Sequence, residues 1–194
     1  MTHPKLVHSM SSPDFYGHNP DSVQLIQTHI SFIFIAGDLV YKVKKAVDFG
    51  FLDFTTLENR KFYCDEELRL NRRLASEIYL EVVSIGEDKS GNLYLGARDN
   101  IIDYAVKMKR LPEEKMLNRL ISEGKVDDSI MDRVAERVYE FHREAATGDE
   151  IDRIGGIDTI RHNHDENFEQ TIQYIGTSID RDRHQFIKSY AENF

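Results

Sequence analysis

The stretch Ile30-Ser31-Phe32-Ile33-Phe34-Ile35-Ala36-Gly37-Asp38-Leu39-Val40-Tyr41-Lys42-Val43-Lys44 decides the fold. Its two halves are rich in β-branched and aromatic residues, and the Ala36-Gly37-Asp38 segment between them is typical of a tight turn. The run ahead of it, from Val23 to Thr28, also alternates between apolar and polar residues. These patterns predict three antiparallel strands, the last two of which form a hairpin.

A long helix is predicted to follow the hairpin. Thr55 and Glu58 match a capping box, with Thr at the N-cap and Glu three residues on. The helix then runs from about Thr56 to about Ala75, with Cys64 on its apolar face as a buried small residue. Three further strands are predicted at Tyr79–Ile85, Leu93–Leu95 and Ile101–Met108.

The pattern then changes from the period of strands to that of helices. Predicted helices lie between Pro112 and Gly124, from an Asp127 or Asp128 cap to Thr147, at Glu166–Ile175 and at Ile179–Tyr190, with Gly155–Asn163 as a loop. The fold class is therefore α+β. Residues 1–20 are predicted to be an extended segment, residues 21–110 a sheet-rich layer, and residues 111–194 a helical layer.

Composition restricts the functional class. The 194 residues include 25 basic and 34 acidic side chains, for a net charge of −9, which argues against nucleic acid or an anionic membrane as the main partner. Cys64 is the single cysteine, so no disulfide can form within the chain. This favours a reducing, cytoplasmic location. No apolar run approaches the ~18 residues of a membrane span.

The order of elements and the wording of several blocks carry a family resemblance. A sheet-rich part with one helix after its third strand, followed by helices, resembles the protein-kinase plan. The sequence resembles a bacterial group of aminoglycoside-phosphotransferase-like proteins over about residues 23–145. The matching blocks are Thr28–Ser31, Ala36–Asp38, Val40–Lys42, Asp48–Phe54, Glu66–Leu74, Tyr104–Met108 and Phe141-His142.

The resemblance implies a nucleotide site in a kinase-like N-lobe at residues 21–110. Lys42 would bind the nucleotide phosphates, with Lys44 on the same strand face as the competing choice. Glu67 would be the carboxylate partner of the lysine, with Glu66 as the alternative. His29 and Ser31 would lie in the loop over the phosphates. Met108 and Arg110, with Lys109 between them, would form the hinge that holds adenine.

The chemistry of a complete phosphotransferase is not present in this sequence. Related enzymes have a His-Gly-Asp type motif with an Asn five residues beyond the Asp, and a later Asp that binds Mg²⁺. Asp48-Phe49-Gly50 resembles the metal-binding triplet but precedes the helix, so we interpret it as a turn. Thr147-Gly148-Asp149 is followed five residues later by Ile154, which cannot bind a metal ion. Catalytic residues and metal ligands are therefore predicted to be absent from this chain.

The functional hypothesis is a nucleotide-binding part of a small-molecule kinase that transfers the ATP γ-phosphate to a hydroxyl and is inactive alone. ATP is the implied cofactor, and Mg²⁺ belongs only to the complete family protein. The acceptor is not specified by the sequence. The alternative is a non-catalytic module for nucleotide sensing or protein interaction.

A helical C-lobe beginning at residue 111 would leave Ile179, Phe186 and Tyr190 unpartnered, which predicts self-association or a mobile C-terminal helix. His162, His164 and Asp165 are interpreted as solvent-exposed rather than metal-binding.

Overall fold

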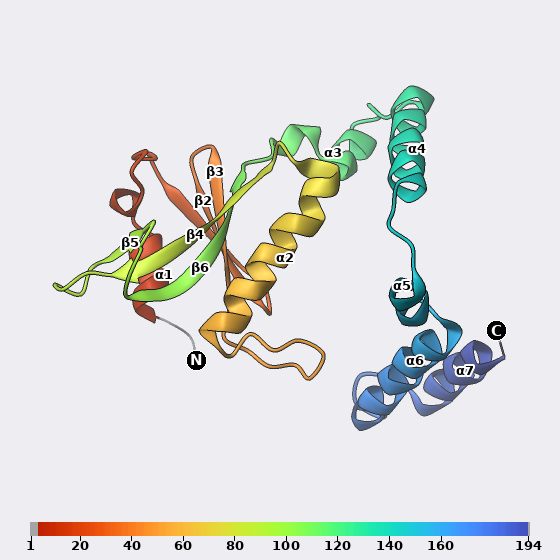
Figure 1. Ribbon diagram of the computed structural model, residues 1–194. Helices are drawn as coiled ribbons and strands as arrows, with labels where there is room; N and C mark the ends of the chain where they lie inside the picture. The colour runs from red at the N-terminus through yellow and green to blue at the C-terminus, as the bar shows by residue number, and fades with distance from the viewer. Residues whose placement is uncertain (1–3, 194) are drawn as a thin grey trace. The chain divides into compact units, whose positions relative to one another are not determined.

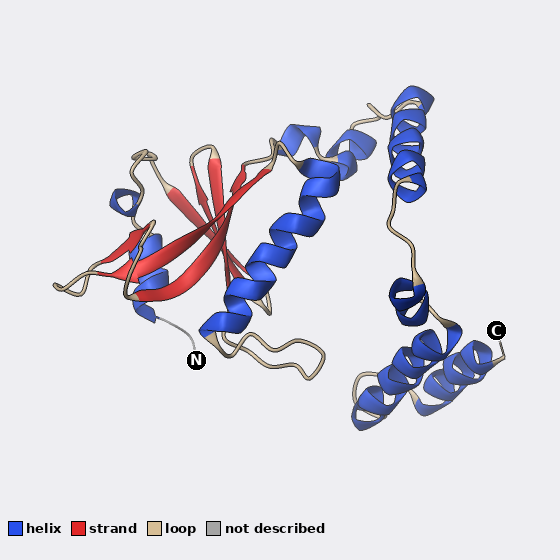
Figure 2. Ribbon diagram, viewed as in Figure 1, coloured by secondary structure: helices blue, strands red, loops and turns tan. Residues whose placement is uncertain are grey.

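The computed structural model describes residues 4–193 (Figure 1). The chain divides into two compact units, and the boundary along the sequence lies between Phe141 and His142. All the strands described belong to the first unit, and the second unit contains helices (Figure 2). The predicted α+β class is confirmed. The sequence placed its layer boundary after residue 110, whereas the compact units divide at Phe141.

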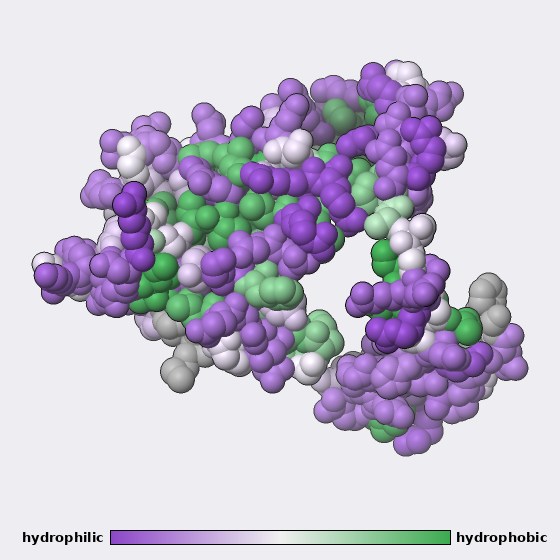
Figure 3. Space-filling model, in the orientation of Figure 1, coloured by the Kyte–Doolittle hydropathy of each residue, from purple (hydrophilic) through white to green (hydrophobic). Residues whose placement is uncertain are grey.

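The first unit is built on one antiparallel sheet of six strands in the order β1-β2-β3-β6-β4-β5. A two-residue loop joins β2 to β3, and Gly37 there has φ +61°, a conformation that glycine adopts without steric cost. In Figure 3, green apolar residues gather over this sheet and are bordered by purple polar ones. The strands are β1 (Val23–Gln27), β2 (Ser31–Ala36), β3 (Leu39–Lys44), β4 (Tyr79–Glu87), β5 (Leu93–Leu95) and β6 (Ile101–Lys109).

A short N-terminal helix covers one face of the sheet. The prediction of an extended segment over residues 1–20 is wrong for its described part, because α1 (Pro4–Met10) and the 3₁₀ helix η1 (Pro13–Phe15) form there. Tyr16 Oη donates to the carbonyl of Met10 at 2.6 Å. A helix this short is marginal by itself, and burial of Leu6 and Met10 stabilises it. The main core consists of Leu6, Met10, Tyr16, Phe32, Phe34, Ala36, Tyr41, Val43, Ile85, Leu93 and Ala105.

The long helix α2 (Leu57–Ala75) packs on the other face, against β4 and β6. Its N-cap is Thr56, whose Oγ1 accepts from the N–H of Asn59 at 3.0 Å. The predicted capping box of Thr55 and Glu58 is therefore wrong by one residue. Thr55 is held by Asp53, to which it donates from both its N–H and its hydroxyl, and so the cap falls to the next residue.

A buried ion pair fixes the start of α2 against the sheet. Arg60 Nε donates to Asp103 Oδ1 at 2.9 Å, and its Nη1 donates to the carbonyls of Phe54 and Thr55 at 3.1 Å each. Both charged side chains are buried. One guanidinium thus joins α2, β6 and the loop before the helix. A planar group with several donors suits this role better than an ammonium would.

The first unit ends in helices. The 3₁₀ helix η2 (Glu113–Lys115) and α3 (Leu117–Ser122) occupy the segment predicted between Pro112 and Gly124, and Gly124 has φ +64° beyond the helix end. In α4 (Asp128–Arg143) the cap is Asp127, whose Oδ1 accepts from the N–H of Ile130 at 3.0 Å. The sequence alone allowed either Asp127 or Asp128 as the N-cap of this helix.

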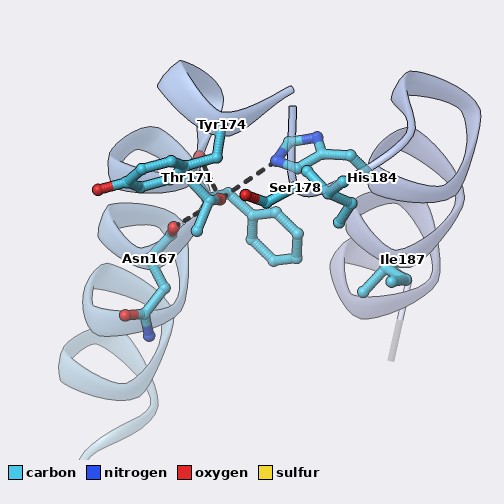
Figure 4. Close-up of a pocket in the computed structure, with 8 residues that line it drawn as sticks. Asn167, Thr171, Tyr174, Ser178, His184 and Ile187 are labelled. Atoms are coloured by element: carbon cyan, nitrogen blue, oxygen red, sulfur yellow. Dashed lines mark hydrogen bonds between the residues drawn. The ribbon is translucent and has the colours of Figure 1, made fainter. Parts of the chain in front are cut away.

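The second unit contains α5 (Asp149–Ile154), α6 (Ile157–Thr171), the 3₁₀ helix η3 (Ile172–Tyr174) and α7 (Arg181–Glu192). The predicted loop at 155–163 is wrong, because Gly155 ends α5 and Gly156 is already the N-cap of α6. Figure 4 shows His184 of α7 facing Thr171 of α6, with 3.3 Å between His184 Nε2 and Thr171 Oγ1. These residues line a pocket of about 550 Å³ with mainly apolar walls.

Among residues 4–193, no helix combines the length and apolar character that crossing a bilayer requires.

Candidate anion-binding site on the sheet

Two lysines project from β3 toward α2. Successive side chains of a strand point to opposite faces, and Tyr41 and Val43 are buried in the core beside α1. Lys42 and Lys44 therefore lie on the opposite face, where their ammonium groups reach Glu67 in the middle of α2. The packing of helix on strand brings Glu67 to two lysines that lie 25 and 23 residues earlier in the sequence.

Glu67 bridges the two lysines. Lys42 Nζ donates to Glu67 Oε1 at 2.9 Å, and Lys44 Nζ donates to Glu67 Oε2 at 2.8 Å. The predicted pairing of Lys42 with Glu67 is confirmed, and the competing lysine takes part as well. Glu66 instead pairs with Arg69 at 2.7 Å, away from the lysines. With two ammonium groups against one carboxylate, the cluster has an excess of positive charge that could attract an anion.

Burial and hydrogen bonding act in opposite directions on Glu67. Burial raises the pKa of its carboxyl, but the hydrogen bonds and charges of Lys42 and Lys44 outweigh burial and lower the pKa overall. Lys44 is only 6% exposed, and its Nζ lies 4.8 Å from the centre of the Phe54 ring. Lys42 is 27% exposed. The two lysines therefore differ in their access to solvent.

Three uncharged groups lie near the cluster, of which Cys64 and Ser31 are buried and Tyr79 is partly buried. Burial raises the pKa of the Cys64 thiol to about 12, so this cysteine is not a reactive thiolate. Burial and the charge of Glu67 raise the pKa of Tyr79. Ser31 is opposite Lys44 in the sheet and fully buried, and its Oγ has no hydrogen-bond partner among the residues described.

The remaining predicted site residues are distributed along the sheet. His29 is exposed in the turn between β1 and β2. Met108 lies opposite Val40, on the face of the lysines. The backbone N–H groups of Lys109 and Arg110 donate to the carbonyls of Ile78 and Asp38 at 2.9 and 2.8 Å. Arg110 also lines a hollow of about 250 Å³ together with Asp21, Ser22, Gln24, Ile35 and Gly37.

Two features of the site were missed by the sequence analysis. Phe54, which lies beside Lys44, was noted only as part of a resembling block. The Arg60–Asp103 pair, which positions α2 and hence Glu67, had no signal beyond an unexpected charge within an apolar strand. An aspartate within a strand that is otherwise buried needs a cation partner, and this requirement could have pointed to it.

The segments that the sequence analysis interpreted as non-catalytic or not metal-binding form local turns, caps and side-chain contacts. Gly50 has φ +82° and donates its N–H to Asp48 Oδ1 at 2.8 Å, as in an Asx turn. Gly148 is the N-cap of α5. His164 Nδ1 lies 3.0 Å from Asp165 Oδ1, and among residues 4–193 no three His, Cys, Asp or Glu side chains are grouped as a metal site would require.

The comparisons with known proteins identify distant relatives. Uncharacterised proteins of Mycobacterium bovis and of two strains of Mycobacterium tuberculosis are 26% identical to this chain over 172 residues. The match covers 89% of the chain and 33% of each relative, so the chain spans about a third of their length. No family model matches the sequence. No solved structure matches it either.

Proposed function

We propose that this chain is the nucleotide-binding part of a kinase-like phosphotransferase, in which Lys42 binds the phosphates of ATP. The observation that carries the proposal is the ion pair between Lys42 of β3 and Glu67 of α2. A strand lysine held by a helix carboxylate is the arrangement by which protein kinases orient the lysine that contacts the nucleotide phosphates. The resemblance of the sequence blocks to aminoglycoside-phosphotransferase-like proteins supports the same assignment.

The chemistry of the cluster supports an anionic ligand. An ammonium group has three N–H donors, and Lys42 uses one of them on Glu67. Its partial exposure leaves the other donors accessible to a phosphate oxygen. The lowered pKa of Glu67 keeps its carboxylate charged at neutral pH, so it can orient the Lys42 side chain.

Existing backbone hydrogen bonds limit where the adenine ring could bind. The hinge proposed at Met108 and Arg110 would hold adenine through backbone groups, but the N–H groups of Lys109 and Arg110 already bond within the sheet region. Adenine would therefore use other backbone groups, and the hollow beside Arg110 and Ile35 is the place we propose for it. Ser31 and His29 would border the phosphates through backbone atoms, because the Ser31 hydroxyl is buried.

We propose that the chain binds ATP without turning it over. The sequence holds neither a His-Gly-Asp type motif nor the later metal-binding Asp, so the chain supplies the lysine and its glutamate but not the catalytic base or the Mg²⁺ ligands. Transfer to a small-molecule hydroxyl, in the cytoplasm, is proposed for a complete protein that would contain this part.

The exposed Phe186 and Tyr190 of α7 fit the additional proposal that the isolated chain self-associates, which sedimentation velocity tests.

Calorimetric titration with ATP tests the nucleotide role. We expect saturable binding with a Kd on the order of 1 mM or tighter, and a weakening of about tenfold in Lys42→Ala through loss of a charge-assisted hydrogen bond. Lys61→Ala is the matched control, because Lys61 pairs with Asp65 on the exposed side of α2, the helix that carries Glu67. Absence of binding, or equal binding by Lys42→Ala, contradicts the proposal.

An assay of ADP release tests the proposed inactivity of the chain. We expect no ATP turnover by the chain with or without Mg²⁺. A kinase part without catalytic residues and a nucleotide-sensing module both bind ATP without hydrolysis, so this result is consistent with either class. Turnover that is lost in Lys42→Ala would contradict the proposed inactivity of the chain.

A further inference from the structure

The two lysines that bond to Glu67 differ in their exposure to solvent and in the contacts that they make. Lys44 is 6% exposed and contacts both the carboxylate of Glu67 and the face of the Phe54 ring. Lys42 is 27% exposed, and its one ion pair among the described residues is with Glu67. Both donate to the same carboxylate, but to different oxygens. Lys42 can therefore offer its other N–H donors to a ligand while Lys44 keeps Glu67 neutralised.

Lys44 is the lysine that must remain paired with Glu67. Moving it off Glu67 would leave a buried ammonium without a counter-charge, which is strongly unfavourable. Its neighbour across the sheet, Ser31, is fully buried, so no route to solvent opens on that side. Lys42 lies two residues nearer the middle of β3 and is partly exposed, so its other N–H donors can turn toward a ligand while Glu67 remains neutralised.

We infer that Lys44 is a positioning residue, which holds Glu67 and α2 against the sheet and so leaves Lys42 free to bind the polyphosphate chain of a nucleotide. The inference rests on the proposed function above and adds a division of roles between the two lysines. Its consequence is specific: without the Lys44 charge, Glu67 binds Lys42 alone and competes with the phosphates for it. Loss of Lys44 then weakens nucleotide binding although Lys44 does not contact the nucleotide.

Removal of the competing carboxylate should reverse this loss. In Lys44→Met, we expect ATP affinity to fall by about three- to tenfold, up to the equivalent of one charge-assisted hydrogen bond. In Lys44→Met/Glu67→Gln, the side-chain amide carbonyl can still accept from Lys42 and orient it, but no charge competes with the phosphates, so affinity should return to within about threefold of the wild type. A purely structural role for Lys44 predicts no recovery of ATP affinity beyond the recovery of stability, which urea unfolding of both variants measures. Circular dichroism confirms that each variant is folded, and Lys61→Met is the control.

Lysine-selective NMR of the wild-type chain tests the same inference without a destabilising variant. The probe is inorganic triphosphate, titrated while the side-chain ¹H and ¹⁵N signals of both lysines are followed, with Lys42→Arg and Lys44→Arg used only for assignment. We expect the Lys42 signal to shift and the Lys44 signal to stay. A Lys44 signal that shifts as much as that of Lys42 overturns the division of roles.

The failure of the proposed function would be distinguishable from the failure of this inference. If neither ATP nor triphosphate binds the wild type, the nucleotide role is wrong, and the Glu67 carboxyl titration then tests Lys44 alone. A positioning role predicts that Lys44→Met raises the pKa of Glu67 more than Lys42→Met does. An equal or smaller rise in Lys44→Met would overturn the inference whatever the ligand.

Discussion

Lys44 Nζ donates a hydrogen bond to Glu67 Oε2 at 2.8 Å, and this bond joins the last residue of β3 to the middle of α2. The ammonium is almost fully buried, so the bond neutralises a charge that would otherwise be costly inside the unit. The same carboxylate orients Lys42 at the edge of solvent. Structural and ligand-binding roles therefore meet in one side chain.

The pH dependence of stability should report on Glu67. Its pKa is lower in the folded chain than in an unfolded one, so it stabilises the fold above the unfolded pKa of about 4.3, and this contribution is lost as pH falls through the folded pKa. Urea unfolding of the wild type and Glu67→Gln at several pH values measures it. We expect the wild type to be the more stable at pH 7 and the difference to shrink as the solution is acidified below about pH 4. A difference that is constant with pH would show that the Glu67 charge is not stabilising.

The buried Arg60–Asp103 pair should be sensitive to the loss of one partner. Arg60→Ala leaves the Asp103 carboxylate buried without its cation, and we expect a loss of about 3–5 kcal/mol in the free energy of unfolding. Arg60→Met/Asp103→Leu, which removes both charges, should be less destabilised than the single variant. Lys61→Ala breaks an exposed pair and should cost at most about 1 kcal/mol. Equal effects of the exposed and buried substitutions would contradict the assignment.

The N-terminal helix should be part of the cooperative fold. Met10 is completely buried beneath the sheet, so Met10→Ala is expected to lower the free energy of unfolding by about 2–5 kcal/mol. Met116→Ala, at an exposed methionine of the same unit, should change it by less than about 0.5 kcal/mol. Chemical denaturation measures both. A Met10→Ala variant as stable as Met116→Ala would place the N-terminal segment outside the core.

A close approach of backbone to side chain should make Gly86 intolerant of substitution. A Cβ atom at Gly86 would lie 2.3 Å from the Cβ of Ala97, closer than two carbons can pack. Gly86→Ala should therefore cost about 1–3 kcal/mol of stability. Gly86→Ala/Ala97→Gly, which removes the opposing methyl group, should recover most of this loss. If the second substitution adds to the damage, the contact is not the cause.

The buried hydroxyl of Ser31 should contribute nothing favourable to stability. Its Oγ has no hydrogen-bond partner among the described residues, so Ser31→Ala removes a desolvated polar group at little cost in packing. We expect the free energy of unfolding to be unchanged or higher by about 1 kcal/mol. Thermal unfolding of the two proteins decides this. A clear loss of stability would reveal a favourable interaction of the hydroxyl.

Local sequence patterns sufficed for most of the first unit. Alternation in residues 23–28 and 39–44 located β1 and β3, because side chains that point alternately to opposite faces leave a period of two in the sequence. The apolar, β-prone run between them located β2. The same alternation put Lys42 and Lys44 on one face together, although it could not choose between them. Sequence patterns failed at α1, a short helix whose Leu6 and Met10 are buried against strands distant in the sequence.

The sequence by itself determined the α+β class, the strands and the face on which the lysines lie, since these follow from periodicity and turn chemistry between near neighbours. Only the tertiary structure decided that Glu67 bridges both lysines and that Arg60 pairs with Asp103. It also decided that Lys44 is the buried member of the pair. The physical reason is that charge pairing and burial depend on which segments pack together, and residues 23 to 43 positions apart become neighbours only when α2 packs on the sheet.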